Sequence, residues 1–219
     1  MTPSAGEGRR KDPDRTRRRL LEAAFHEIHK SGFQAASLDR ILRAAGVTKG
    51  ALYHHFENKT SLGYAVVDEV LGGHICAFAE ELARAREPSD ALREWVLSPP
   101  RLPLRLGCPV NNLALEMSPL DEGFRARIEA VFRRWREAIA VALARGQAEG
   151  SVRRDLDVER AASFVLAALE GSVSLAKSAQ SEVLFASNMG VLAEWLDSLR
   201  PERGGKANVV DRGRSSPEV

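Results

Sequence analysis

The stretch SLDRILRAAGVTKGALYHHFENK, residues 37–59, predicts two short helices joined by a tight turn and the start of a third helix. Ser37 is suited to cap the first helix, because its hydroxyl can accept a hydrogen bond from a free backbone N–H. The apolar residues that follow recur at helical spacing and form one face: Leu38, Ile41, Leu42 and Ala45. Gly46 comes next, and glycine is the usual residue where a helix must end in a sharp turn.

The second helix of this stretch runs over residues 49–56, and Thr48 is its predicted cap. Leu52 and Phe56 are four residues apart, so they share one face and can pack on the first helix. The remaining positions are small or polar and point away from that contact. Two helices joined by a short glycine-containing turn, with a polar second helix, are typical of a helix-turn-helix.

The stretch AAGVTKGALYHHFENKTSL resembles the DNA-binding signature of the TetR (tetracycline-repressor-like) family of bacterial transcription regulators. The upstream stretch TRRRLLEAAFHEIHKSGFQAASL is similar to the first helix of that domain and to its Gly-Phe turn, so the resemblance covers roughly residues 14–62. It implies an all-α fold: an N-terminal three-helix helix-turn-helix DNA-binding domain, followed by a C-terminal helical ligand-binding and dimerisation domain.

The resemblance also implies which residues face the major groove: Thr48, Lys49, Gly50, Tyr53 and His54. Lys49 is the best base reader among them, because an ammonium group can donate to O6 and N7 of guanine. Gly50 has only a hydrogen atom as its side chain, which lets the backbone approach DNA closely. Tyr53 and His54 are predicted to contact phosphates, which set position rather than sequence preference.

Further DNA contacts are predicted around this core, at Ala51, His55, Lys59, Ser37 and Arg40. His55 has two interpretations, a phosphate contact or packing against the next helix. Lys59 lies at the start of the fourth helix, where its charge and the helix N-terminus can hold one phosphate. Arginines at positions 15 and 17–19 crowd the first turns of helix one, against the helix dipole, which indicates phosphate contact or a solvated face.

Charge is distributed unevenly along the 219 residues. Residues 1–60 hold 12 Lys and Arg against 7 Asp and Glu, a net charge of +5, whereas the remainder has a net charge of −3. A basic head on an acidic body fits a DNA-binding protein. The N-terminus lacks an apolar signal region and no apolar run approaches 18 residues, so we expect a cytoplasmic protein without a membrane partner.

We predict four segments: a disordered basic arm over 1–13, the DNA-binding domain over 14–60, the helical ligand-binding and dimerisation domain over 61–200, and a disordered tail over 201–219. Arg9, Arg10 and Lys11 in the arm are either DNA contacts or part of a solvated tail. In the body, one helix is predicted from residue 60 to about residue 86, and a second ends at about residue 97. A third begins at 109, a fourth covers 121–149, a fifth begins at 157 and a sixth covers 181–199. The Gly72–Gly73 pair in the first of these helices indicates a kink or room for a ligand.

Ligand-pocket candidates combine aromatic and polar residues of the predicted body helices: His74, Phe78, Trp95, Cys108, Asn111, Asn112, Glu116, Phe132 and Trp135. The polar residues that follow Cys108 either orient a ligand or satisfy loop backbone. Phe132 and Trp135 are included because the corresponding helix lines the ligand cavity in the family that the chain resembles. Together they suggest a small, partly apolar inducer.

Cys108 precedes Pro109 at the predicted start of a helix, where a thiol can have a lowered pKa. That would make it a sensor of electrophiles or oxidants. The alternative is a small buried cysteine that packs the turn. The other cysteine, Cys76, has no metal-type spacing to it, so the chain offers no predicted metal site and no cofactor.

The last two predicted helices have apolar residues on more than one side, which indicates a second buried surface. By resemblance they form a four-helix bundle across a twofold axis. The predicted dimer-interface residues are Phe164, Ala168, Leu175, Leu184, Leu192 and Trp195.

Three functions were weighed. The first is a homodimeric repressor that binds a near-palindromic double-stranded operator and is released by a small-molecule inducer. The second is an activator or ligand-independent regulator with the same head. The third, a helical enzyme, lacks a convincing acid–base pair, nucleophile triad or metal set in the sequence, so we expect no enzymatic activity.

Overall fold

The computed structural model describes residues 13–98 and 103–201, and these residues form helices and loops without a strand. The predicted arm up to Lys11 and the predicted tail after Pro201 lie outside the described residues. The elements are α1 (Pro13–Ser31), α2 (Leu38–Ala45), α3 (Lys49–His55), α4 (Lys59–Ala65), η1 (Val66–Leu71), α5 (Gly72–Arg84), α6 (Pro88–Leu97), α7 (Pro109–Met117), α8 (Glu122–Glu149), α9 (Val158–Ala179) and α10 (Glu182–Asp197).

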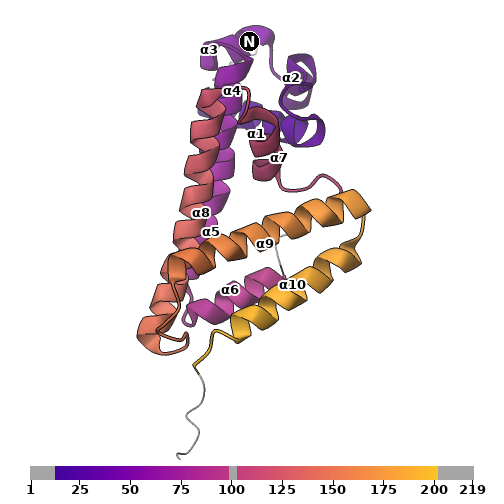
Figure 1. Ribbon diagram of the computed structural model, residues 1–219. Helices are drawn as coiled ribbons and strands as arrows, with labels where there is room; N and C mark the ends of the chain where they lie inside the picture. Colours follow the sequence, from indigo (N-terminus) through magenta and orange to yellow (C-terminus); the bar gives the residue numbers. More distant parts are fainter. Residues whose placement is uncertain (1–12, 99–102, 202–219) are drawn as a thin grey trace, which may run out of the picture.

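The head, residues 13–58, consists of α1, α2 and α3 around a small apolar core (Figure 1). Leu20 and Ala24 of α1 are fully buried, and Ile41 of α2 and Leu52 of α3 are each 1% exposed. These are positions that helical spacing predicts for the inner face. Phe56 directly follows α3 and closes the core at 5% exposure. The head therefore forms the helix-turn-helix that the sequence predicts.

The body, residues 59–201, begins with one continuous helical segment made of α4, η1 and α5. Its middle part, η1, is a π-helix of six residues directly before Gly72. The helix is therefore irregular next to the Gly72–Gly73 pair, but the irregularity is a wider helical turn. Residues 59–84 are long and apolar enough to cross a membrane by length and composition, a test that core helices also pass. The segment crosses the predicted domain boundary at residues 60–61 without a break.

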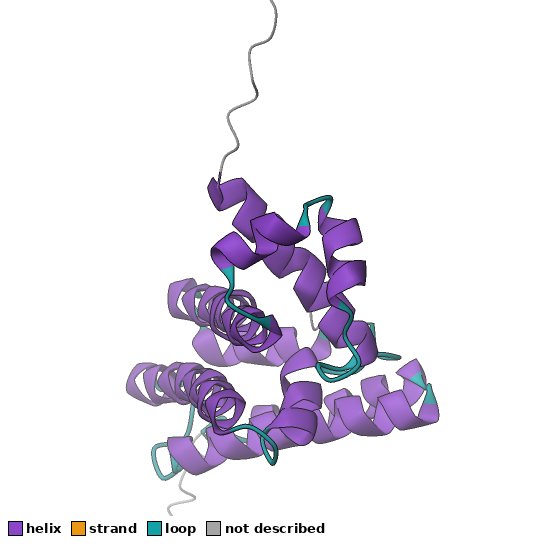
Figure 2. Cartoon of the chain, turned by 90° about the horizontal axis from the view of Figure 1, so that it is seen from above, coloured by secondary structure: helices purple, strands orange, loops and turns teal. Residues whose placement is uncertain are grey.

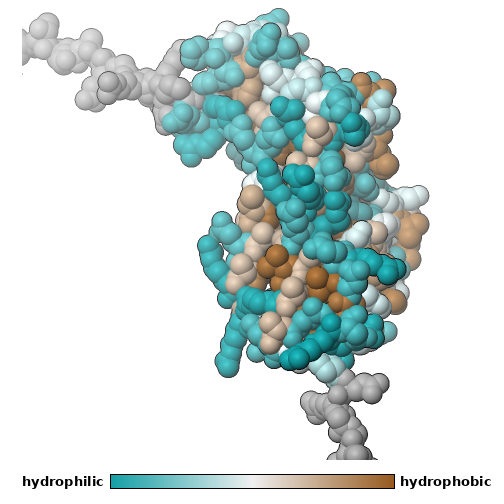
Figure 3. All heavy atoms as spheres, turned by 60° about the vertical axis from the view of Figure 1, so that its left-hand side comes forward, coloured by the Kyte–Doolittle hydropathy of each residue, from teal (hydrophilic) through white to brown (hydrophobic). Residues whose placement is uncertain are grey.

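In the body α5 and α8 run side by side along the length of the molecule, and α9 and α10 lie across their lower part together with α6 (Figures 1 and 2). Ile139 and Leu143 of α8 are almost fully buried in this part of the body, whereas Phe124, at the start of α8, is buried against Phe33 of the head and Tyr64 of α4. Figure 3 shows one side of the molecule, on which hydrophilic side chains predominate and apolar patches are visible over the lower half. The body core thus forms along α8, the longest helix.

Candidate DNA interface and ligand site

The turn between α2 and α3 is built by caps on both sides. Gly46 ends α2 in the left-handed region, at φ 61°, and its N–H donates to the carbonyl of Arg43. Thr48 begins α3, and its hydroxyl accepts from the N–H of Ala51 at 3.2 Å. A side chain other than glycine is strained at that φ, so the angle between the two helices depends on Gly46. This turn holds α3 in a fixed orientation on the head.

The outer face of α3 is polar and exposed. Thr48, Lys49, Gly50, Tyr53 and His54 are all exposed, which is the set that the resemblance places toward DNA. A Cβ added at Gly50 would meet nothing within 4 Å, so the helix backbone itself is open to an approaching surface. The ammonium of Lys49 lies 6.0 Å from the Tyr53 ring, which leaves its donors free toward the outside.

Several residues that were predicted to contact DNA form bonds within the protein. Arg40 pairs with Glu27 of α1 and also donates to the carbonyl of Ala35 at 3.2 Å. The Lys59 ammonium donates to the carbonyl of Gln34 at 2.9 Å, and partial burial lowers its pKa. Arg40 and Lys59 therefore first hold the head together, and a phosphate would have to compete for these donors.

Four more residues predicted to contact DNA are partly buried or already have partners within the protein. Ser37 caps α2, accepting from the N–H of Arg40 at 3.4 Å. Ala51 and His55 are half-buried, and the His55 ring lies 5.2 Å from that of His54 and 6.4 Å from that of Phe56. Arg17 forms an ion pair with Glu69 of η1. Neither of the two interpretations for this arginine, a phosphate contact or a solvated face, included such a partner.

The carboxylate of Glu116 joins the body to the head. Its Oε2 accepts from the N–H of Phe33 and its Oε1 from the N–H of Gln34, each at 2.8 Å. Gly32, at φ 79°, turns the chain so that both N–H groups face α7, and a Cβ there would come within 2.9 Å of the carboxylate. Glu116 was predicted to orient a ligand, and the alternative prediction, satisfaction of loop backbone, is the one observed.

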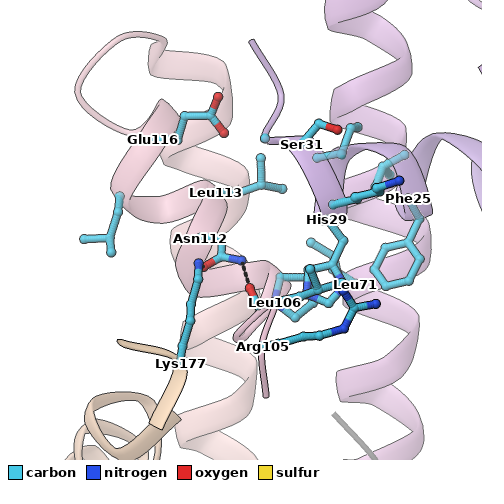
Figure 4. Close-up of a pocket in the computed structure, with 16 residues that line it drawn as sticks. Phe25, His29, Ser31, Leu71, Arg105, Leu106, Asn112, Leu113, Glu116 and Lys177 are labelled. Carbon is cyan, nitrogen blue, oxygen red and sulfur yellow. Dashed lines mark hydrogen bonds between the residues drawn. The ribbon is translucent and has the colours of Figure 1, made fainter. Parts of the chain in front are cut away.

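A cleft of about 530 Å³ opens between head and body, beside this link (Figure 4). Its head wall is α1, with Phe25 and His29, and its body wall combines α7, the loop before it and Lys177 of α9. His29 donates through Nε2 to the carbonyl of Gly107 at 2.8 Å, and burial lowers its pKa. Asn112 bridges the body wall, donating to the Leu106 carbonyl at 2.7 Å and accepting from Lys177 at 3.0 Å.

Of the nine predicted pocket residues, only Asn112 and Glu116 line this cleft. Three others form an aromatic cluster in the body core: the ring of Phe78 lies 4.6 Å from that of Trp95, and Trp95 lies 6.1 Å from Trp135. Phe132 is half-buried and His74 is exposed, with its ring 5.8 Å from Phe25. Asn111 ties α7 to α9 by donating to Ser174 at 3.2 Å. The predicted set therefore does not form one pocket.

The basic residues of the cleft are not among the predicted pocket residues; they are His29, Lys30, Arg105 and Lys177. They lie on three segments that are far apart in the chain. Nothing in the local pattern marks them, because the charges only converge once α1, the loop before α7 and the end of α9 meet.

Of the two interpretations of Cys108, the structure shows the buried cysteine and not the reactive thiol. Cys108 is at the N-cap of α7, as expected, but it is 4% exposed, and burial raises the pKa of its thiol far above the ordinary value. Backbone groups of Val110 and Asn111 act in the opposite direction and are outweighed. The thiol contacts the carboxyl of Glu170 on α9, whose pKa burial raises to about 7. Within the described part of the chain, Glu170 Oε2 and Trp135 Nε1 are buried without a hydrogen-bond partner.

The outer face of α9 and α10 exposes several large apolar side chains. Phe164 is 50% exposed, with its ring 4.9 Å from that of Trp195, and Leu175 is 57% exposed. Two valines of α10 that were not predicted, Val183 and Val191, are the most exposed, at 80% and 64%. Leu192 was predicted for this face but is 4% exposed and packs into the protomer's own core, because it lies about 100° around the helix from Val191.

Two family models match this chain. The model described as "Bacterial regulatory proteins, tetR family" matches residues 20–66, and "Tetracyclin repressor-like, C-terminal domain" matches residues 83–189. The transcriptional regulator AcuR of Cereibacter sphaeroides is 30% identical over 167 residues, which cover 72% of this chain and 74% of that protein. The chain belongs to the TetR family.

Other TetR-family proteins agree with this assignment. The HTH-type transcriptional repressor DhaR of Mycobacterium sp. (strain GP1) is 28% identical over 158 residues, covering 72% of this chain and 80% of its own length. The crystal structure of a TetR transcriptional regulator from Chloroflexus aurantiacus superposes with a TM-score of 0.73 at 29% identity, covering 84% of this chain and 95% of that one. This TetR-family protein is a DNA-binding transcriptional regulator, and the family is one of regulators rather than of enzymes.

Proposed function

We propose that this TetR-family regulator is a homodimeric repressor that binds a near-palindromic operator and leaves it when a small-molecule effector binds. The observation that carries the proposal is the exposed polar face of α3, held rigidly by the caps at Gly46 and Thr48. Such a helix fits the major groove, where three or four side chains can reach base edges. Several relatives, DhaR among them, carry the name of transcriptional repressors, which supports repression as the direction of control.

Base reading falls to Lys49 in this proposal, and positioning on phosphates to Thr48, Tyr53 and His54. The Lys49 ammonium has no ion-pair partner among the described residues, so no internal bond must break before it contacts a guanine. Arg40 and Lys59, which already hold parts of the head, would contribute less. As a DNA-binding regulator the protein would act in the cytoplasm, where the bacterial chromosome is.

Dimerisation is assigned to the α9–α10 face, defined by Phe164, Leu175, Val183, Val191 and Trp195. Exposed apolar side chains of this size on one side of two adjacent helices indicate a protein partner. A second copy meets the same face by twofold symmetry, which places two heads on one DNA. Their recognition helices must then lie about one helical turn of DNA apart, about 34 Å.

Effector control is supported by the link through α7. Glu116 holds the head at Phe33 and Gln34, while Asn111 and Asn112 of the same helix contact Ser174 and Lys177 of α9. A movement of α7 relative to α9 would therefore shift the head. An effector that binds more tightly to the arrangement whose head spacing does not fit the operator lowers operator affinity. The amount is set by the ratio of the effector's affinities for the two arrangements.

The test is a titration of the full-length protein against the DNA directly upstream of its own coding region, at two salt concentrations. We expect saturable binding of one dimer to one site, with affinity that falls steeply as salt rises because phosphate contacts release counterions. Light scattering of the free protein at the same concentration should give the mass of a dimer. A monomer in solution that binds all DNA sequences equally would refute the proposal.

A further inference from the structure

We propose that the cleft between head and body is a binding site for a small amphipathic organic anion, with one carboxylate or phosphate group joined to an apolar part. The inference rests on the proposed function only in its last step, the effect on DNA binding. The cleft volume of about 530 Å³ lies inside the range of about 300–1,000 Å³ that small-molecule sites occupy.

The charges that line the cleft favour an anion. Lys30, Arg105 and Lys177 contribute three cations, and the one acid in the lining is Glu116. Both oxygens of Glu116 are already occupied by the N–H groups of Phe33 and Gln34. These bonds orient the carboxylate toward the head without neutralising it, so the lining, with three cations and one acid, has a net positive charge.

The donors of the cleft are also free to receive a ligand. Lys30 and Arg105 form no ion pair or hydrogen bond within residues 13–98 and 103–201. Lys177 makes one hydrogen bond, to the neutral amide of Asn112, which neutralises none of its charge. The positive field is strong enough that Lys177 contributes, after burial, to lowering the pKa of His29 on the opposite wall. Arginine and lysine side chains are the usual donors for a carboxylate or phosphate.

The remaining lining accounts for the apolar part of the ligand. Ile28, Leu71 and Leu113 line the cleft and are buried. Phe25 and Leu106 also line it and are half-buried (Figure 4). Covering such surface contributes about 25 cal/mol for each Å² removed from water. A purely inorganic anion would leave these side chains unused, which is why we assign an amphipathic ligand.

The two walls belong to different parts of the molecule. Phe25, His29 and Lys30 are on α1 of the head, whereas Arg105 and Lys177 belong to the body. A ligand that contacts both walls binds best at one distance between them, so its affinity depends on the arrangement of head and body. If the proposed repressor function holds, occupancy of the cleft changes operator affinity by the same factor by which DNA changes ligand affinity.

Calorimetry on the full-length protein tests the site directly, with octanoate and octyl phosphate as probes and octylammonium as the control of opposite charge. We expect one saturable site per protomer for at least one of the two anions and none for octylammonium. Arg105→Gln and Lys177→Gln should each weaken binding about 5–10-fold, because each removes one charge from the anion site. The glutamine at 177 can still donate to Asn112, so the body wall is retained.

Arg154→Gln is the matched control, since Arg154 is an exposed arginine outside the cleft without a recorded partner. It should bind the probe as the unchanged protein does, and thermal unfolding should confirm that all three variants fold. The site is refuted if neither anion binds at millimolar concentration, if octylammonium binds equally well, or if Arg105→Gln and Lys177→Gln bind as tightly as Arg154→Gln.

Operator binding with and without the bound probe then separates the two proposals. Tight anion binding with unchanged operator affinity would keep the cleft as a ligand site and remove its regulatory role. Specific operator binding by a protein whose cleft takes no anion would keep the repressor and refute the cleft. A change of operator affinity that is lost in Arg105→Gln supports both.

Discussion

Two exposed surfaces of this protein differ in chemistry, and the difference indicates their partners. The outer face of α3 is polar and carries Lys49 and His54, and its side chains make few contacts within the protomer. The α9–α10 face carries Phe164, Leu175 and Val191, with open space around Gly171 and Gly190. Charged donors suit a polyanion, which attracts them over a long range. Apolar side chains contribute favourable binding free energy only when a close-fitting surface removes them from water, so they suit another copy of the chain.

The largest effect should come from breaking the apolar surface. Val191→Asp places a charge in the proposed interface, and we expect monomers and a loss of operator affinity on the order of 100-fold or more, because the second head no longer adds to the first. Analytical ultracentrifugation and operator titration measure the two effects. Val141→Asp is the matched control, since Val141 of α8 is 62% exposed against 64% for Val191. Dimers that persist in Val191→Asp would remove the α9–α10 face from consideration.

Breaking the polar surface should have a smaller effect that depends on sequence. Lys49→Ala is expected to cost about 1–3 kcal/mol at the operator, since one base contact is lost. Affinity for unrelated DNA should change by much less, because phosphate contacts of Thr48 and Tyr53 remain. The measurement is the ratio of operator to unrelated-DNA affinity at fixed salt. An equal loss on both sequences would reassign Lys49 from base reading to phosphate contact.

Behind the apolar surface lies a charge that is costly to bury. Burial raises the pKa of Glu170 to about 7, above the ordinary value of 4.5. Below pH 4.5 the carboxyl is neutral in the folded and unfolded states. Between pH 4.5 and about 7 the unfolded chain releases the proton while the folded protein retains it, so stability falls across this range and then stays at the lower value. Glu170→Gln stays neutral, so we expect it to match the unchanged protein at pH 4.5 and to exceed it by about 2 kcal/mol at pH 7.5.

Thermal unfolding of both proteins across this pH range provides the measurement. For a chain of this length, 2 kcal/mol corresponds to a difference of roughly 4–8 °C in the unfolding temperature. A pH-independent difference between the two proteins would show that Glu170 is ionised alike in both states.

The smallest effect is expected at Glu116, which links the body to the head. Glu116→Gln keeps one acceptor for the N–H groups of Phe33 and Gln34 but replaces the other with a donor, which should cost about 1 kcal/mol of stability. Operator affinity should shift by a few-fold at most, since the head becomes less firmly held. Amide hydrogen exchange at Phe33 and Gln34 checks this, and unchanged protection there would show that the link does not hold the head.

The sequence predicted the helices and the exposed face of α3 well, because both depend on local signals. Ser37 and Thr48 each cap the helix that follows, as predicted from residue type and position, and Asp121, Asp157 and Ser181 cap α8, α9 and α10 in the same way. The face of α3 was predicted equally well, because a seven-residue helix has one inner side and Leu52 identifies it. Pairing of Arg40 with Glu27 and of Arg17 with Glu69 was not predictable, because the partners are far apart in sequence.

By itself, the sequence determined the helix-turn-helix, its caps and the family to which this regulator belongs, because these depend on spacing within a few turns of helix. Only the tertiary structure decided the state of Cys108, where burial outweighs the helix N-terminus, and the side of α10 that faces outward, Val191 rather than Leu192. The anion cleft likewise exists only after folding, because Lys30, Arg105 and Lys177 converge from three separate segments. Burial and the meeting of distant charges are properties of packing, and no local pattern of residues contains them.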